Sequence, residues 1–146
     1  ANVGDSRAVL GFVTRRLLRS MPGALSLTVD QTSEVDEERQ RIHAAGGYVS
    51  PAIEGAQPAR IWHDAQMVPP GGLAVSRSIG DHSMRGIGVV AEPVLSSHTV
   101  RAEDRWLIVA SDGVWQWLEP LAAVELMHTQ RAADGCARLV AASTEK

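Results

Sequence analysis

The amino-acid sequence predicts an α+β domain in which antiparallel strand pairs come first and helices lie between and after them. Three observations predict this class. Short apolar segments alternate with turns rich in Gly, Pro and Asp, a helical pattern occupies the first third of the chain, and two amphipathic stretches close it. The chain has 146 residues, of which 45% are hydrophobic, so it is large enough for one domain with a packed core.

Strands are predicted from the short apolar segments. Residues 1–3 and 8–10 flank a Gly-Asp-Ser-Arg turn, so we expect a β-hairpin there. Residues 25–29 alternate weakly and indicate another strand. Residues 94–100 predict an edge strand, because a proline precedes them. Residues 106–110, Trp-Leu-Ile-Val-Ala, form a continuous apolar run that favours a buried strand.

Helices are predicted from periodicity and end signals. Residues 33–45 begin with good N-cap residues and several acids, which favour the positive end of a helix, and Gly46 follows them. Residues 121–128 and 132–143 predict amphipathic helices. Residues 48–70 are interrupted by Pro and Gly, which indicates short strands and loops.

Charge and cysteine content restrict the class of protein. The net charge of −3 argues against a general nucleic-acid-binding protein, and no apolar run reaches the roughly 18 to 20 residues of a membrane span. The single cysteine, Cys136, cannot form an internal disulfide, which favours a reducing compartment such as the cytoplasm or nucleus. We expect Cys136 to be a small core residue. The only basic cluster, Arg15, Arg16 and Arg19, is interpreted as a solvated turn.

Asp112 carries the strongest chemical signal. It follows the predicted buried strand, and Gly113 after it would allow a sharp turn and the close approach of a ligand. A carboxylate at low dielectric is costly unless it is paired, hydrogen-bonded or bound to a cation. Two interpretations therefore stay open, a divalent metal ligand or an aspartate that caps the turn at residues 114–118.

Two further segments carry weaker signals. Asp5 lies in the Gly-Asp-Ser-Arg turn, where an aspartate usually bonds its own backbone. Arg77, between two serines, could hold a phosphate, but a buried pair with Asp81 is the favoured interpretation. The five histidines lack the spacing of a zinc site, so oxygen ligands dominate, and these suit Mg²⁺ or Mn²⁺.

Five segments, in order, resemble the metal-dependent protein phosphatase 2C (PPM-type) family. The residues of these motifs resemble those of plant and protist members more closely than those of bacterial members. The segments are residues 1–9 (Ala-Asn-Val-Gly-Asp-Ser-Arg-Ala-Val), 27–49 with Glu37 and the Arg-Ile and Ala-Gly-Gly-Tyr-Val steps, 60–81 with Arg-Ile-Trp and Leu-Ala-Val-Ser-Arg-Ser-Ile-Gly-Asp, 91–93 (Ala-Glu-Pro), and 106–115 with Ser-Asp-Gly.

The resemblance implies a fold and a reaction. The fold would have two antiparallel β-sheets sandwiched between helices. The reaction would be hydrolysis of phosphoserine or phosphothreonine in phosphorylated proteins, by a water activated at a binuclear Mg²⁺ or Mn²⁺ centre. Asp112 matches a ligand of the metal pair and would be the catalytic carboxylate. Asp5 matches an aspartate associated with a third, weakly bound ion.

The resemblance also implies what stands outside the chain. Residues 1–146 would be the central to C-terminal portion of the phosphatase domain, incomplete at both ends. The family's Asp-Gly-His motif and phosphate-binding Arg would precede Ala1, and its closing Asp-Asn motif would follow Lys146. We therefore expect this portion alone to be inactive, and residues 48–70 correspond to the variable flap.

Two other functions share features with this one. Gln116 stands where the family commonly has an acid, which keeps open a pseudophosphatase that binds a partner without turnover. A haloacid-dehalogenase-type phosphohydrolase also places Asp after an apolar strand, but it needs an Asp-x-Asp motif that this sequence does not contain.

Overall fold

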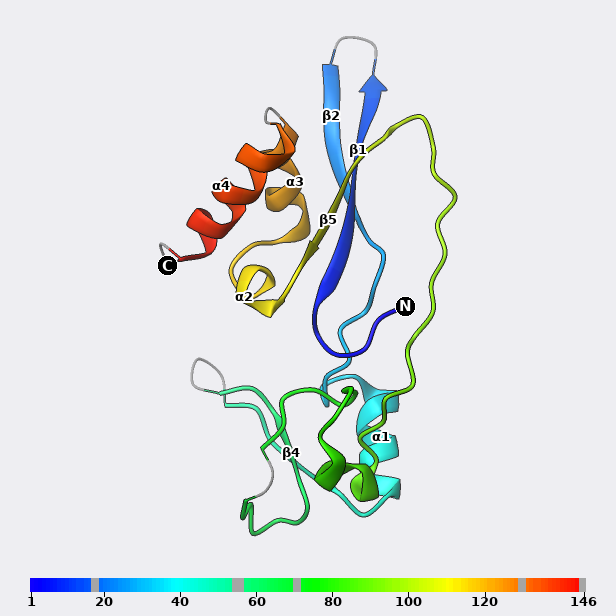
Figure 1. Cartoon of the computed structure of the whole chain (residues 1–146), viewed down its shortest axis with the longest axis vertical. Coiled ribbons are helices and arrows are strands. Elements are labelled where there is room, and N and C mark those ends of the chain that lie inside the picture. Colours follow the sequence, from blue (N-terminus) through cyan, green and yellow to red (C-terminus); the bar gives the residue numbers. More distant parts are fainter. Residues whose placement is uncertain (17–18, 54–56, 70–71, 129–130, 145–146) are drawn as a thin grey trace. The chain divides into compact units, whose positions relative to one another are not determined.

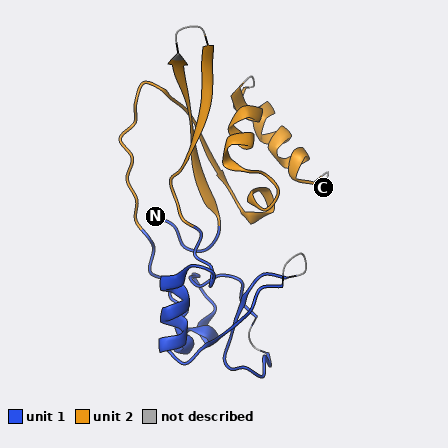
Figure 2. Ribbon diagram, turned by 180° about the vertical axis from the view of Figure 1, so that it is seen from behind, with its two compact units in different colours: residues 1–5, 30–94 blue, residues 6–29, 95–146 orange. Residues whose placement is uncertain are grey.

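The computed structural model describes residues 1–16, 19–53, 57–69, 72–128 and 131–144. These residues form two units with separate cores, coloured differently in Figure 2. Unit 1 comprises Ala1–Asp5 and Asp30–Val94, and unit 2 comprises Ser6–Val29 and Leu95–Lys146.

A three-stranded antiparallel sheet organises unit 2. Its order is β2 (Arg19–Ser26), β1 (Arg7–Arg16) and β5 (Asp104–Ala110), with β1 in the centre (Figure 1). The predicted hairpin between residues 1–3 and 8–10 is wrong. The long strand β1 pairs along its length with β2, whereas Asn2 forms only an isolated bridge, to Val94. A ten-residue strand offers a ladder that three residues cannot match.

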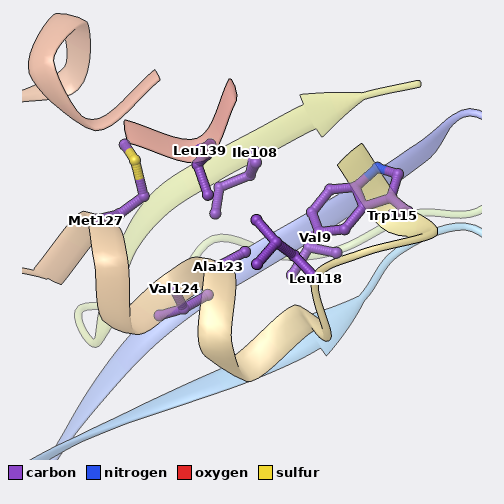
Figure 3. Close-up of a cluster of buried hydrophobic side chains, with 8 residues drawn as sticks. All are labelled: Val9, Ile108, Trp115, Leu118, Ala123, Val124, Met127 and Leu139. Atoms are coloured by element: carbon purple, nitrogen blue, oxygen red, sulfur yellow. The ribbon is translucent and has the colours of Figure 1, made fainter. Parts of the chain in front are cut away.

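Three helices follow β5 and cover one face of this sheet. They are α2 (Asp112–Trp115), α3 (Pro120–His128) and α4 (Ala132–Thr144), so the two predicted amphipathic helices are confirmed. Complete burial of one Val, Leu, Ile or Met side chain contributes about 1.5–3 kcal/mol to the stability of the fold. The core of unit 2, drawn in Figure 3, consists of Val9, Ile108, Trp115, Leu118, Ala123, Val124, Met127 and Leu139.

The helices leave the opposite face of β5 uncovered within unit 2. Ile108 is 5% exposed, whereas its neighbours Leu107 and Val109 are 63% and 68% exposed. The strand is therefore correctly predicted, but only one of its faces is buried, because successive side chains point to opposite faces. The predicted strand at residues 94–100 is wrong. Beyond the bridge from Val94, the structure assigns no strand to these described residues.

Unit 1 is built around α1 (Asp36–Ala44), which begins three residues later than predicted, after Val35 at the N-cap. Two short strands, β3 (Tyr48–Ser50) and β4 (Arg60–Trp62), form an antiparallel pair. The prediction of short strands and loops for residues 48–70 is therefore confirmed for the described residues of this range. A 3-10 helix, η1 (His82–Ile87), completes the unit. Its core is Ile42, Ile61, Met84, Ile87 and Val89.

The α+β class, with antiparallel sheets and helices, is confirmed. Cys136, expected in the core, is instead exposed on α4, because the buried side of that helix carries Leu139 and Ser143. In the part of the chain that the structure describes, no helix has the length and apolar character needed to cross a membrane.

Candidate metal and phosphate site

Asp112 begins α2 directly after β5, at the end of the sheet where Arg7 pairs with Ala110. The junction is fixed by Trp115. Its indole Nε1 donates to the carbonyl of Ala110 at 2.9 Å and to that of Arg7 at 3.2 Å. The Arg7 guanidinium also lies over the Trp115 ring, with Cζ 5.7 Å from the ring centroid. The backbone that carries the Asp112 carboxylate is therefore tied to two strands.

The Asp112 side chain is half-buried and accepts a hydrogen bond from the residue at the C-cap of α2. Gln116, one helical turn later, donates from Nε2 to Asp112 Oδ2 at 2.9 Å. The residue at the N-cap position is Ser111, not Asp112, so the turn-capping interpretation loses its support. The partner role of Gln116 could not be read from the sequence, although its i, i+4 spacing from Asp112 was visible there.

Gly113 does not play the predicted part. Its φ is not among the positive values of this structure, and a Cβ placed there would meet Ser111 Oγ at 3.6 Å, an ordinary contact. The chain thus passes from β5 into α2 without needing the conformational freedom of a glycine. The prediction of a sharp glycine turn is wrong at this position.

Asp5 lies in unit 1 and directly follows Gly4, whose backbone is held by two hydrogen bonds. Gly4 is buried and has φ of +99°, a conformation that favours glycine. Its N–H donates to Gln31 Oε1 at 2.7 Å, and its carbonyl accepts from the Gln31 N–H at 3.0 Å. The half-buried Asp5 therefore extends from a fixed turn. Asp5 thus belongs to unit 1, whereas Asp112 belongs to unit 2.

A third carboxylate, Glu38 on α1, is the centre of an ionic cluster that the sequence reading missed. It is 4% exposed. Arg41 donates to both its oxygens, at 2.9 and 2.7 Å, and Arg77 Nη2 donates at 2.6 Å. The Ser76 hydroxyl donates at 2.5 Å. Burial raises the pKa of Glu38, but the hydrogen bonds from Arg41, Arg77 and Ser76 outweigh it and hold that pKa far below its ordinary range.

This cluster corrects two interpretations of the Ser-Arg-Ser segment. Arg77 pairs with Glu38 rather than with Asp81, which is exposed and stands at the N-cap of η1 with φ of +43°. Ser76 is fully buried and its hydroxyl is used by Glu38, so it is not available to hold a phosphate. In the sequence, this cluster was indicated only by the opposite charges of residues 38 and 41, which are spaced i, i+3 in the predicted helix.

The described residues fit part of a metal site. A carboxylate such as Asp112 offers hard oxygen donors, which suit Mg²⁺ or Mn²⁺. Glu38 does not fit this role, because two guanidinium groups already compensate its charge. Among the described residues, no group of three or more His, Cys, Asp or Glu side chains could hold an ion. The carboxylate of Asp112 therefore has donor atoms of the kind such an ion prefers.

Sequence relatives were found over nearly the whole chain. A family model described as protein phosphatase 2C matches residues 1–145. Probable protein phosphatase 2C 72 of Arabidopsis thaliana is 36% identical over 146 residues, which cover 99% of this chain and 43% of the relative. Probable protein phosphatase 2C 14 of Oryza sativa subsp. japonica is 32% identical over 99% of this chain and 27% of the relative. The chain spans less than half the length of these curated relatives.

Solved structures share the fold. A serine-threonine phosphatase 2C from Toxoplasma gondii has a TM-score of 0.78 at 23% identity, over 98% of this chain and 48% of that chain. A phosphatase from a pathogenic strain of the same organism has a TM-score of 0.73 at 22% identity, over 99% of this chain and 42% of that chain. At these identities the likeness shows the α+β fold and not the activity.

Proposed function

Because this chain belongs to the protein phosphatase 2C family, we propose that the complete protein is a metal-dependent serine/threonine protein phosphatase. Residues 1–146 are its central to C-terminal portion, and its substrates are phosphorylated proteins. The match of the family model to residues 1–145 carries this proposal. The share of the relatives' length that the chain covers, 43% and 27%, supports the view that further parts of the domain complete the site.

Asp112 is the residue to which we assign catalytic metal binding. The β5–α2 junction fixes its backbone, and the amide of Gln116 fixes one carboxylate oxygen, so the second oxygen can be directed at a cation without a large loss of side-chain freedom. Mg²⁺ or Mn²⁺, bound as a pair, would supply a hydroxide near neutral pH and neutralise phosphoryl charge. Asp5 serves a third, weaker ion.

A pseudophosphatase that binds a partner is the second candidate, and one contact favours it. Gln116 donates to Asp112 Oδ2, so an amide occupies an oxygen that a cation would otherwise use. An acid at this position would instead add a negative charge. Weak or absent binding of the metal pair in the complete protein would favour this alternative over the enzyme.

The test of the proposal is Asp112→Asn in the complete protein, with Mn²⁺ and a phosphothreonine peptide. We expect turnover to fall to background, at least about a hundredfold or ~2.7 kcal/mol of barrier, because the variant loses the charge and keeps the shape. Asp134→Asn on α4 is the matched control, since it removes an equal charge from an exposed site. Wild-type turnover by Asp112→Asn at saturating Mn²⁺ contradicts the assignment.

A further inference from the structure

Gln31 makes an unusual set of contacts for a residue with no place in the proposed chemistry. It is 3% exposed. Its side-chain Oε1 accepts the Gly4 N–H, and its own N–H donates to the Gly4 carbonyl, at 2.7 and 3.0 Å. Both backbone polar groups of Gly4 are thus bound by one residue that lies 27 positions away in the sequence.

Gln31 is itself held from the other side. The Ser76 N–H donates to the Gln31 carbonyl at 2.8 Å, and the Ser76 hydroxyl donates to Glu38. Since Glu38 is fixed by Arg41 and Arg77, a continuous set of short hydrogen bonds runs from the buried ionic cluster through Ser76 and Gln31 to Gly4. Within unit 1, every step of this path is buried or half-buried.

The next residue in the chain is Asp5. Its Cα–Cβ direction follows from the orientation of the Gly4 peptide. Gly4 has φ of +99°, and both its backbone polar groups are hydrogen-bonded to Gln31. A side-chain ligand must be held to within about 0.5 Å to act well. A loss of the Gln31 contact would therefore misdirect the Asp5 carboxylate without removing it.

We infer that Gln31 is a positioning residue for the Asp5 carboxylate, and so for the third, weakly bound metal ion of the phosphatase. This inference rests on the proposed function. Gln31 does not touch the ion. It fixes the Gly4 turn from which Asp5 extends, and the Glu38 cluster fixes Gln31.

The experiment uses the complete protein and two substitutions with different expectations. Gln31→Met has nearly the same size but cannot accept the Gly4 N–H, whereas Gln31→Glu keeps an acceptor oxygen in the same place. Mn²⁺ binding is measured by isothermal titration, and kcat and KM are measured on one phosphothreonine peptide across Mn²⁺ concentrations.

For Gln31→Met we expect the Kd of the weakest Mn²⁺ ion to rise at least about threefold while tight Mn²⁺ binding stays unchanged. The value of kcat should fall about five- to tenfold at limiting Mn²⁺ and recover as Mn²⁺ is raised, with KM constant. Gln31→Glu, which keeps an acceptor oxygen for the Gly4 N–H, should lose less of kcat than Gln31→Met. If Gln31→Met does not fold, Gln31→Asn replaces it, because its amide is one methylene too short to reach Gly4.

The control is Ser50→Ala, also in unit 1. Ser50 is 5% exposed, and its hydroxyl accepts from Arg60 N at 3.1 Å and donates to the Arg60 carbonyl at 3.3 Å. The Ser50→Ala variant therefore loses buried hydrogen bonds, as Gln31→Met does. We expect a lower melting temperature and unchanged Mn²⁺ titration for this variant.

The outcomes separate the inference from the proposed function. If Asp5→Ala removes the weak ion but Gln31→Met lowers only the melting temperature, the positioning role of Gln31 is overturned and the phosphatase proposal stands. If the wild-type protein binds no weak third ion, the role of Asp5 and that of Gln31 are overturned together. If it has no Mn²⁺-dependent turnover at all, the proposed function itself fails.

Discussion

Two carboxylates show how surroundings decide what the same group can do. Glu38 accepts from Arg41, Arg77 and Ser76, so its charge is compensated inside unit 1 and it acts as a structural residue. Asp112 has a neutral amide partner, Gln116, which orients the carboxylate without cancelling its charge. A cation therefore gains more at Asp112 than at Glu38, because the full negative charge is still available to it.

At the residue scale, Asp5→Ala in the complete protein should lower kcat by at least about tenfold, ~1.4 kcal/mol of barrier. A weak ion serves turnover more than assembly of the metal pair, so tight binding of the first two Mn²⁺ ions should be nearly unchanged. Isothermal titration with Mn²⁺ and steady-state kinetics measure both. An unaltered kcat with a lower melting temperature would mean that Asp5 is only a turn residue.

At the element scale, the Glu38 cluster joins α1 to the segment that follows β4. Arg77 Nη1 donates to the carbonyl of Glu92 at 2.9 Å, and Arg41 Nε donates to that of Gly88 at 2.9 Å. Both arginines thus use some donors on Glu38 and others on backbone carbonyls. One buried charge organises the loop-rich half of unit 1, where regular secondary structure supplies few backbone hydrogen bonds.

Glu38→Gln should therefore destabilise the complete protein by roughly 3 kcal/mol, because it leaves two guanidinium groups uncompensated. Glu37→Gln, its exposed neighbour on α1, is the control and should have little effect. Thermal or urea unfolding measures the difference. Equal stability of the two variants would contradict a stabilising role for the cluster.

The pH dependence follows from the lowered pKa of Glu38. Its ordinary value is 4.5, and the folded protein holds it well below this. The unfolded chain thus binds the proton first, so the stabilisation is fully present above about pH 4.5 and is lost as pH falls towards the folded pKa. Between pH 5 and pH 3, roughly, wild type should lose more stability than Glu38→Gln. Parallel curves for the two proteins would contradict this.

At the scale of the whole molecule, the exposed apolar side chains of β2 and β5 are the feature with the widest consequence. Leu25 and Leu107 both pair with Leu10, so their side chains share one face of the sheet with Val109 two residues along β5. Leu25, Leu107 and Val109 are 45%, 63% and 68% exposed within this chain. Soluble monomers rarely expose contiguous apolar surfaces of this kind.

We accordingly predict that the purified 146-residue chain has no Mn²⁺-dependent phosphatase activity and self-associates. Light scattering and a phosphopeptide assay test both statements. Val109→Asp should reduce the association, whereas Val140→Asp, at a 56% exposed position on α4, should not. A monodisperse, active preparation would contradict the proposal that other parts of the domain complete the site.

Features that depend on neighbouring residues could be predicted from the amino-acid sequence. The apolar run before Ser-Asp-Gly predicted β5 and the place of Asp112 at its end, and periodicity predicted α1, α3 and α4. These features follow from local hydrophobic patterns, which a single segment carries. The family was indicated separately, by the resemblance of five ordered segments to its motifs.

Contacts between residues far apart in the sequence could be identified only in the folded chain. The sequence predicted residues 1–3 as the partner of residues 8–10, but β1 pairs with β2, with which it forms a longer ladder. Arg77 had acids on both sides in sequence, yet it pairs with Glu38, which is 39 residues away. Gly4 and Gln31 are 27 residues apart. Such pairs are chosen by how whole elements pack, because the cost of burying a charge or an N–H is met by whichever partner the fold brings within hydrogen-bond distance.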